Sequence, residues 1–201
     1  NTTAFLWIKH NKNIVRDLTI ANVVMKGGAP IRVENWATVE NVEIRDCVQR
    51  QARYAAGGIY CYSGIISNVL FKGCRNTELG SSAAYALRLQ DGLATHCEVT
   101  ECSGGGSQNA NEGAAPVLVT GGKLRNSRIH GNTALTGGDK NTGDDCCAGI
   151  AAIGSNAKIY NCIVSGNSSD SSKVIGGLYC RNASVWNCTV AGNTTPQDSK
   201  G

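Results

Sequence analysis

The chain has 201 residues and a formal net charge of +4, and 17% of its residues are charged. Lysine and arginine are spread along the chain without a motif of a nucleic-acid-binding protein, so nucleic acid is not an expected partner. No apolar run of about 18 residues and no N-terminal signal sequence is present, so no membrane span is expected within these residues. A surface that is polar rather than ionic is typical of an extracellular protein.

Two short segments of alternating apolar residues recur in turn along the chain, about once every 28 residues. The first segment carries the pairs Leu6/Ile8, Ile31/Val33, Ile59/Cys61, Leu87/Leu89, Val117/Val119, Ile150/Ala152 and Leu178/Cys180. The second follows about ten residues later and carries Leu18/Ile20, Val42/Ile44, Val69/Phe71, Cys97/Val99, Ser127/Ile129, Cys162/Val164 and Cys188/Val190. A period of two predicts β-strands with one buried face.

Polar residues recur at two further positions of the second segment. The position before its first apolar residue is filled by Asp17, Asn41, Asn68, His96, Asn126, Asn161 and Asn187. The last position is filled by Val23, Cys47, Cys74, Cys102, Asn132, Asn167 and Asn193. In stacked strands, equivalent residues lie about 4.8 Å apart, so both sets are expected to form ladders. We expect the first set to be a buried Asn ladder with a structural role, because an unpaired buried amide is costly.

The repeat predicts an all-β fold, a right-handed single-stranded parallel β-helix of about seven coils of roughly 28 residues each. Gly-rich bends between short strands favour this solenoid, and the Leu-dense pattern of leucine-rich repeats is missing. Because the repeat is unbroken, residues 1–201 are expected to form a single domain. No capping segment is evident at either end, so we expect a fragment or a processed part of a longer protein.

Three segments resemble coils of the pectin-lyase-like superfamily of right-handed parallel β-helix proteins: GGIYCYSGIISNVLFKGCRN, AGIAAIGSNAKIYNCIVSGNSS and GGLYCRNASVWNCTVAGNTT. They are especially similar to repeats of secreted and surface-anchored bacterial proteins, including adhesins. The resemblance implies a secreted or bacterial cell-surface location. For function it implies either a non-catalytic module for adhesion or glycan binding, or a polysaccharide lyase or glycoside hydrolase, because one such fold hosts many activities.

An enzyme of this superfamily would need paired acidic residues, or acidic residues with a nearby base, because one group must donate a proton and another accept one. The candidates at expected outward positions are Glu43, Glu98 and Arg128. Glu43 and Glu98 should lie two coils, or about 10 Å, apart. Clustered aspartates of the polygalacturonase type are missing from the strands, so the non-catalytic function is favoured and the enzyme is kept as the alternative.

Aromatic and charged residues are concentrated at outward positions of the first segment. The predicted ligand-binding residues are Trp7, Arg32, Glu34, Tyr60, Tyr62, Arg88 and Tyr179, with Trp36 close by in its loop. Aromatic rings can stack on the apolar faces of sugars while charged side chains bond hydroxyl groups. The predicted ligand is therefore a polysaccharide or a cell-surface glycan. The alternative is that these side chains only cover one face of the solenoid.

The ten cysteines fall mostly on the ladder positions, where a free buried thiol behaves as a small hydrophobic side chain. Parallel stacked side chains hold Cβ atoms farther apart than the ~3.8 Å of a disulfide, so mostly free thiols are expected. The best disulfide candidates are Cys74–Cys102 and Cys162–Cys188, and the adjacent Cys146 and Cys147 could form a strained bridge or pair elsewhere.

Ca²⁺ is the single candidate cofactor. One inter-coil loop contains the oxygen-bearing residues Asp139, Asn141, Asp144 and Asp145. Such side chains can bind Ca²⁺, but their spacing departs from that of an EF-hand. A solvated loop without a metal ion is the favoured interpretation.

Overall fold

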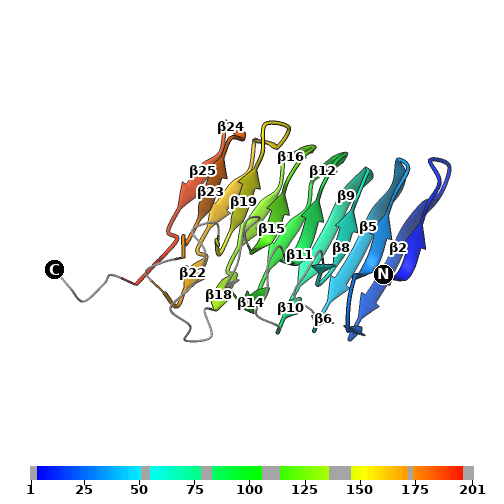
Figure 1. The fold of residues 1–201 in the computed structure, drawn as a ribbon, viewed down its shortest axis with the longest axis horizontal. Helices are drawn as coiled ribbons and strands as arrows, with labels where there is room; N and C mark the ends of the chain where they lie inside the picture. The colour runs from blue at the N-terminus through cyan, green and yellow to red at the C-terminus, as the bar shows by residue number, and fades with distance from the viewer. Residues whose placement is uncertain are drawn as a thin grey trace.

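The structure is a computed structural model that describes residues 4–50, 55–77, 83–105, 114–135, 146–171 and 174–196. Every regular element in these ranges is a β-strand, and neighbouring strands pair in parallel. The chain winds through three sheets in each coil and stacks successive coils side by side (Figure 1). The all-β parallel β-helix predicted from the repeat is thus confirmed, with about six turns.

The first segment of each repeat forms an eight-stranded sheet, called sheet A. Its strands are β1 (Ala4–Ile8), β4 (Ala29–Val33), β7 (Ala55–Ala56), β8 (Ile59–Cys61), β11 (Ala83–Leu89), β15 (Ala115–Val119), β19 (Ile150–Ile153) and β23 (Leu178–Arg181). The inward positions expected from the alternation are in register, since Leu6 pairs with Ile31, and Ile31 with Ile59. This sheet supplies one wall of the core.

The second segment forms an eleven-stranded sheet, called sheet B, which is bent along its middle. In the first coils the strands run through the bend as β2 (Ile14–Ala21), β5 (Ala37–Arg45) and β9 (Gly64–Lys72). In the later coils the bend divides each strand. The resulting pairs are β12 (Leu93–Thr95) and β13 (Glu98–Thr100), β16 (Lys123–Arg125) and β17 (Arg128–His130), β20 (Lys158–Tyr160) and β21 (Ile163–Ser165), and β24 (Ser184–Trp186) and β25 (Thr189–Ala191).

A third sheet, called sheet C, closes each coil with very short strands. These are β3 (Val24–Met25), β6 (Val48–Gln49), β10 (Arg75–Asn76), β14 (Ser103–Gly105), β18 (Thr133–Leu135) and β22 (Ser168–Ser169). The three sheets enclose one apolar core that runs the length of the solenoid, with side chains such as Ile31, Ile44 and Ile129 at 0% exposure.

The bend in sheet B is made by the first set of polar residues, and the expectation that this set is buried is wrong. Asn41, Asn68, Asn126 and Asn161 have φ between 49° and 54°, and all four are exposed. Asn adopts this left-handed conformation more readily than most residues. The left-handed residue shifts the alternation by one position: Val39 and Val42 both point into the core, and Asn41 between them points to solvent.

The buried Asn ladder lies instead at the last position of the repeat. Asn132 and Asn167 have 0% exposure, and their amides hydrogen-bond along the axis to each other and to Asn193. In the preceding coils the same position is filled by buried Cys47, Cys74 and Cys102. All ten cysteines have free thiols, and Cys180 is the exposed one. The structure thus agrees with free buried thiols and contains neither of the two candidate disulfides.

Candidate functional site

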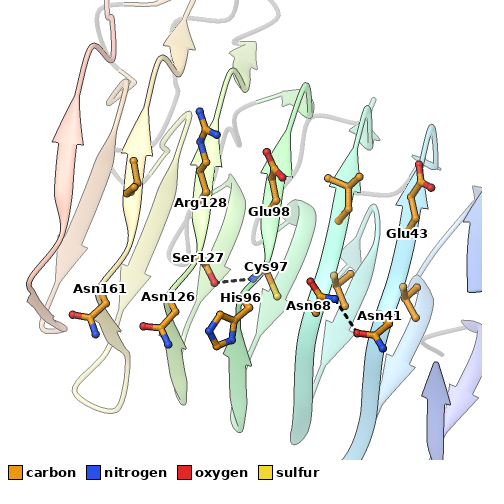
Figure 2. Close-up of a pocket in the computed structure, with 14 residues that line it drawn as sticks. Asn41, Glu43, Asn68, His96, Cys97, Glu98, Asn126, Ser127, Arg128 and Asn161 are labelled. Carbon is orange, nitrogen blue, oxygen red and sulfur yellow. Dashed lines mark hydrogen bonds between the residues drawn. The ribbon is translucent and has the colours of Figure 1, made fainter. Parts of the chain in front are cut away.

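The bend of sheet B forms a groove on its outer surface with a volume of about 760 Å³. We call it the bend groove. It is lined by Asn41, Val42, Glu43, Asn68, Val69, Leu70, His96, Cys97, Glu98, Asn126, Ser127, Arg128, Asn161 and Ile163. Figure 2 shows two parallel rows along it, the left-handed residues in one and the side chains from Glu43 to Arg128 in the other. The groove crosses several coils, so it suits an elongated ligand.

In the row of left-handed residues, only some of the Asn side-chain amides hydrogen-bond to one another. Asn68 Nδ2 donates to Asn41 Oδ1 at 2.8 Å, and Asn41 Nδ2 donates to Asp17 Oδ1 at 3.1 Å. The side-chain amides of Asn126 and Asn161 have no hydrogen bond within the described part of the chain. These two exposed amides can each offer a donor and an acceptor to a ligand.

All three catalytic candidates lie in the bend groove. The register places Glu43 beside Leu70, Leu70 beside Glu98, and Glu98 beside Arg128. Leu70 therefore separates the two carboxylates. Glu98 Oε1 contacts His130 Nε2 at 2.7 Å, which links one candidate acid to a histidine that is not among the predicted site residues. A carboxylate beside an imidazole can exchange a proton, and a bare surface ion pair has the same geometry.

A second groove, of about 620 Å³, lies where the chain turns from sheet A to sheet B. We call it the corner groove. It is lined by Trp36, Tyr62, Ser63, Gln90, Asp91, Thr120, Gly121, Gly122, Lys123, Asn156 and Lys158. Small residues let these turns approach closely: a Cβ on Gly122, whose φ is 75°, would lie 2.6 Å from the Gly92 carbonyl oxygen. The groove combines two aromatic rings with amide, carboxylate and ammonium groups.

Trp36 is unusual in its backbone as well as its exposure. Its φ is 60°, which is sparsely populated for a bulky residue and costs about 1–2 kcal/mol. The side chain is 53% exposed, so burial of the ring does not compensate for this cost. Strained residues of this kind are concentrated at ligand-binding sites. Trp36 lies in a loop and is absent from the alternating strand pattern, so the sequence signal for it is weak.

The ligand-binding residues predicted on sheet A share one outer face but are unequally accessible. Trp7, Arg32, Tyr60 and Arg88 follow one another in register, and the Arg32 guanidinium lies 4.9 Å from the Trp7 ring and 5.8 Å from the Tyr60 ring. Tyr60 and Arg88 are only 5% and 3% exposed, however. The expectation that these two form an open stacking surface is therefore wrong, because they are packed together in the face.

The physical reason is a second apolar cluster on the outside of sheet A. Tyr60 belongs to it, together with Ala56, Ala84, Leu118 and others, and the half-buried Tyr179 packs against it. The Tyr60 hydroxyl donates to Gln90 Oε1.

The remaining predicted ligand-binding residues differ in their setting. Arg32 Nε donates to Glu34 Oε1 at 2.6 Å, and both residues are partly buried. Trp7 and Tyr62 are each 46% exposed. Of the seven predicted residues, Tyr62 lines the corner groove.

The described residues contain no group of three or more His, Cys, Asp or Glu side chains placed to hold a metal ion. The calcium candidates Asp139, Asn141, Asp144 and Asp145 lie outside the described residues. The described part of the chain also contains no helix long and apolar enough to cross a membrane.

These observations define the protein as a parallel β-solenoid. One outer groove follows the bend of sheet B, and another lies where the chain turns from sheet A to sheet B. No protein-family model, curated protein or solved structure matches the chain.

Proposed function

We propose that the protein is a non-catalytic β-helix module that binds glycan chains, as part of a secreted or bacterial cell-surface protein. The observation that supports this function best is the pair of exposed rings, Trp36 and Tyr62, in the corner groove. Large aromatic side chains that stay exposed at the edge of a concave site suit stacking against the C–H faces of sugars.

The polar lining of the corner groove fits the hydroxyl groups of a sugar. Gln90 and Asn156 supply amides, and Asp91 supplies a carboxylate. These groups are carried by the closely packed turns of successive coils, so binding would require little ordering of the protein. Adhesion to a polysaccharide surface is the biological role that follows from this site.

A binding assay with a panel of immobilised polysaccharides tests the proposal. Trp36→Ala and Tyr62→Ala are each expected to weaken binding about five- to thirtyfold, since an aromatic anchor in a binding site contributes on the order of 1–2 kcal/mol. Phe5→Ala is the matched control, because Phe5 is 68% exposed and does not line the corner groove. Absence of binding to every polysaccharide, or equal loss in all three variants, would refute the proposal.

A polysaccharide lyase or glycoside hydrolase is the second candidate function, and the contact between Glu98 and His130 favours it. In that case Glu98 would exchange a proton with the substrate, and the neighbouring Arg128 would stabilise negative charge. The assay is release of unsaturated products or new reducing ends from polyuronides and neutral polysaccharides. Activity that is lost in Glu98→Gln and kept in Glu101→Gln, a surface carboxylate paired with Lys72, would replace the non-catalytic function.

A further inference from the structure

Two lysines lie directly opposite each other in the corner groove. Lys123 on β16 pairs in register with Lys158 on β20, so their Cα atoms are about 4.8 Å apart. Both side chains are exposed, and within the described residues neither has an ion pair. Like charges opposite each other on adjacent strands are destabilising. An anion bound between the two ammonium groups would remove this repulsion.

The positive charge continues along the same coil toward the bend groove. Arg125 is the next outward residue of β16, and Arg128 follows after the bend, on β17, where it lines the bend groove. Neither arginine has an ion pair within the described ranges. The Nε of Arg125 is buried and has no hydrogen-bond partner among the described residues, while the side chain as a whole is half-buried on the outer face. We call Lys123, Arg125, Arg128 and Lys158 the cationic stripe.

The stripe connects the two grooves across the outer face of sheet B. Its lysines line the corner groove and Arg128 lines the bend groove, with Arg125 between them. We infer that both grooves form one continuous site for a glycan chain that carries carboxylate or sulfate ester groups, and that the cationic stripe binds those groups. This inference rests on the glycan-binding function proposed above and specifies the chemical class of the glycan.

The spacing of charges favours a glycan with separated anionic groups over a nucleic acid. Asp91 lines the corner groove, and Glu43 and Glu98 line the bend groove. Glu98 lies beside Arg128 in register. A phosphate on every residue of a polynucleotide would place negative charge against these carboxylates, whereas a glycan can present hydroxyl groups to them and anionic groups to the stripe.

Titration calorimetry with chains of matched length separates the possibilities. The probes are a neutral glycan, a uronate-containing glycan, a sulfated glycan and a single-stranded oligonucleotide. At low salt, at least one anionic glycan is expected to bind about tenfold or more tightly than the neutral glycan, and added salt should remove that advantage. The uronate and sulfated arms identify which anionic group the stripe prefers.

Variants locate the effect. The double variant Lys123→Gln/Lys158→Gln should lower affinity for the anionic glycan about tenfold and leave the neutral glycan unchanged. Lys26→Gln, which removes one exposed charge outside both grooves, should change neither. Arg128→Gln should weaken binding of long anionic chains and leave short ones unchanged if the two grooves form a continuous site. Trp36→Ala should weaken neutral and anionic glycans alike.

Each outcome decides a different point. Equal affinity for neutral and anionic glycans would overturn the inference while the proposed glycan-binding function stands. No binding to any glycan would overturn both. Tighter binding of the oligonucleotide than of every glycan would replace the glycan by a nucleic acid. An unchanged affinity for long chains in Arg128→Gln would overturn the continuity of the two grooves.

Discussion

Asn132 donates two hydrogen bonds to one side-chain oxygen atom of Asn167 in the core of the solenoid. The Nδ2 and the backbone N–H of Asn132 both donate to Oδ1 of Asn167, at 2.9 and 3.1 Å. Asn167 repeats the arrangement on Oδ1 of Asn193, and its Nδ2 also donates to the Ile129 carbonyl at 3.1 Å. Each buried amide is therefore satisfied by the adjacent coils, which is the condition for placing a polar side chain at 0% exposure.

The first prediction concerns this ladder. Asn167→Ala should lower the free energy of unfolding by about 2–4 kcal/mol, because it leaves the buried donors of Asn132 without their acceptor. Asn161→Gly is the matched control, since Asn161 is exposed and has a φ of 54° that glycine adopts freely. Its effect should stay within about 0.5 kcal/mol. Urea denaturation measures both, and equal losses would show that the two Asn positions are not distinguished by burial.

The second prediction concerns two isoleucines on neighbouring coils of sheet B. Ile129 points into the core with 0% exposure, and Ile163 lies on the outer face with 47% exposure. Ile129→Ala should cost about 2–5 kcal/mol through lost burial and a cavity, and Ile163→Ala less than about 0.5 kcal/mol. Ile129→Asp should prevent folding, because it buries an unpaired charge. Thermal and urea unfolding are followed by circular dichroism. A larger loss of stability in Ile163→Ala than in Ile129→Ala would contradict the register.

The third prediction concerns alkaline pH. Burial raises the pKa of the Cys97 thiol from its ordinary value of 9.0 to about 12, and it raises the pKa of Cys162 to about 11. Above about pH 9 the unfolded chain loses protons that the folded chain keeps. The contribution of these two thiols to stability should therefore be constant below about pH 9 and fall as pH rises toward 11–12, by about 1 kcal/mol per pH unit for each thiol.

Cys97→Val provides the test of that pH dependence. Valine fills the same core position at Val42 and Val69 in other coils, so the substitution should be tolerated. The decrease in urea midpoint between about pH 8 and pH 11 should be smaller in the variant than in the parent protein. The same decrease in both proteins would mean that the Cys97 thiol does not contribute.

The fourth prediction concerns thiol reactivity. Only a thiolate that reagents can reach reacts readily. Burial raises the pKa of Cys61 and Cys147 as well, and the hydrogen bond with Cys102, together with burial, raises the pKa of Cys74. In the folded protein, a thiol-specific reagent should label the exposed Cys180 first and the half-buried Cys188 more slowly. The buried thiols should react only on unfolding. Mass spectrometry after brief alkylation identifies the labelled residues, and rapid labelling of Cys74 in the native state would contradict the packed core.

Much of the fold was predictable because strand alternation is local. The pairs Ile31/Val33 and Val42/Ile44 are inward and buried, as a period of two requires. The side of Asn41 was not predictable in this way. Its left-handed backbone inserts a bend that shifts the alternation, and the pattern of residue types does not reveal that shift. The same polar column was consequently expected inside the stack, where the structure has the Asn167 column instead.

The candidate site was predicted in part for a related reason. Alternation placed Glu43, Glu98 and Arg128 on an outward face, and they do line one groove. It placed Tyr60 and Arg88 outward as well, but outward from the sheet is not the same as exposed. Tyr60 is buried in a cluster with Ala84 and Leu118 from other coils, and Arg88 lies over the Tyr60 ring and beside Leu118 in register.

The sequence by itself determined the repeat, the strand positions and the stacking of equivalent residues, because these follow from a two-residue period renewed about every 28 residues. The tertiary structure alone decided which polar column is buried and which outward residues are accessible. It also brought Trp36 and Tyr62 to the corner groove. It aligned Lys123, Arg125, Arg128 and Lys158 in a stripe that runs from the corner groove to the bend groove. Such relationships depend on how bends and coils pack against each other over long sequence distances, and a local pattern does not contain that information.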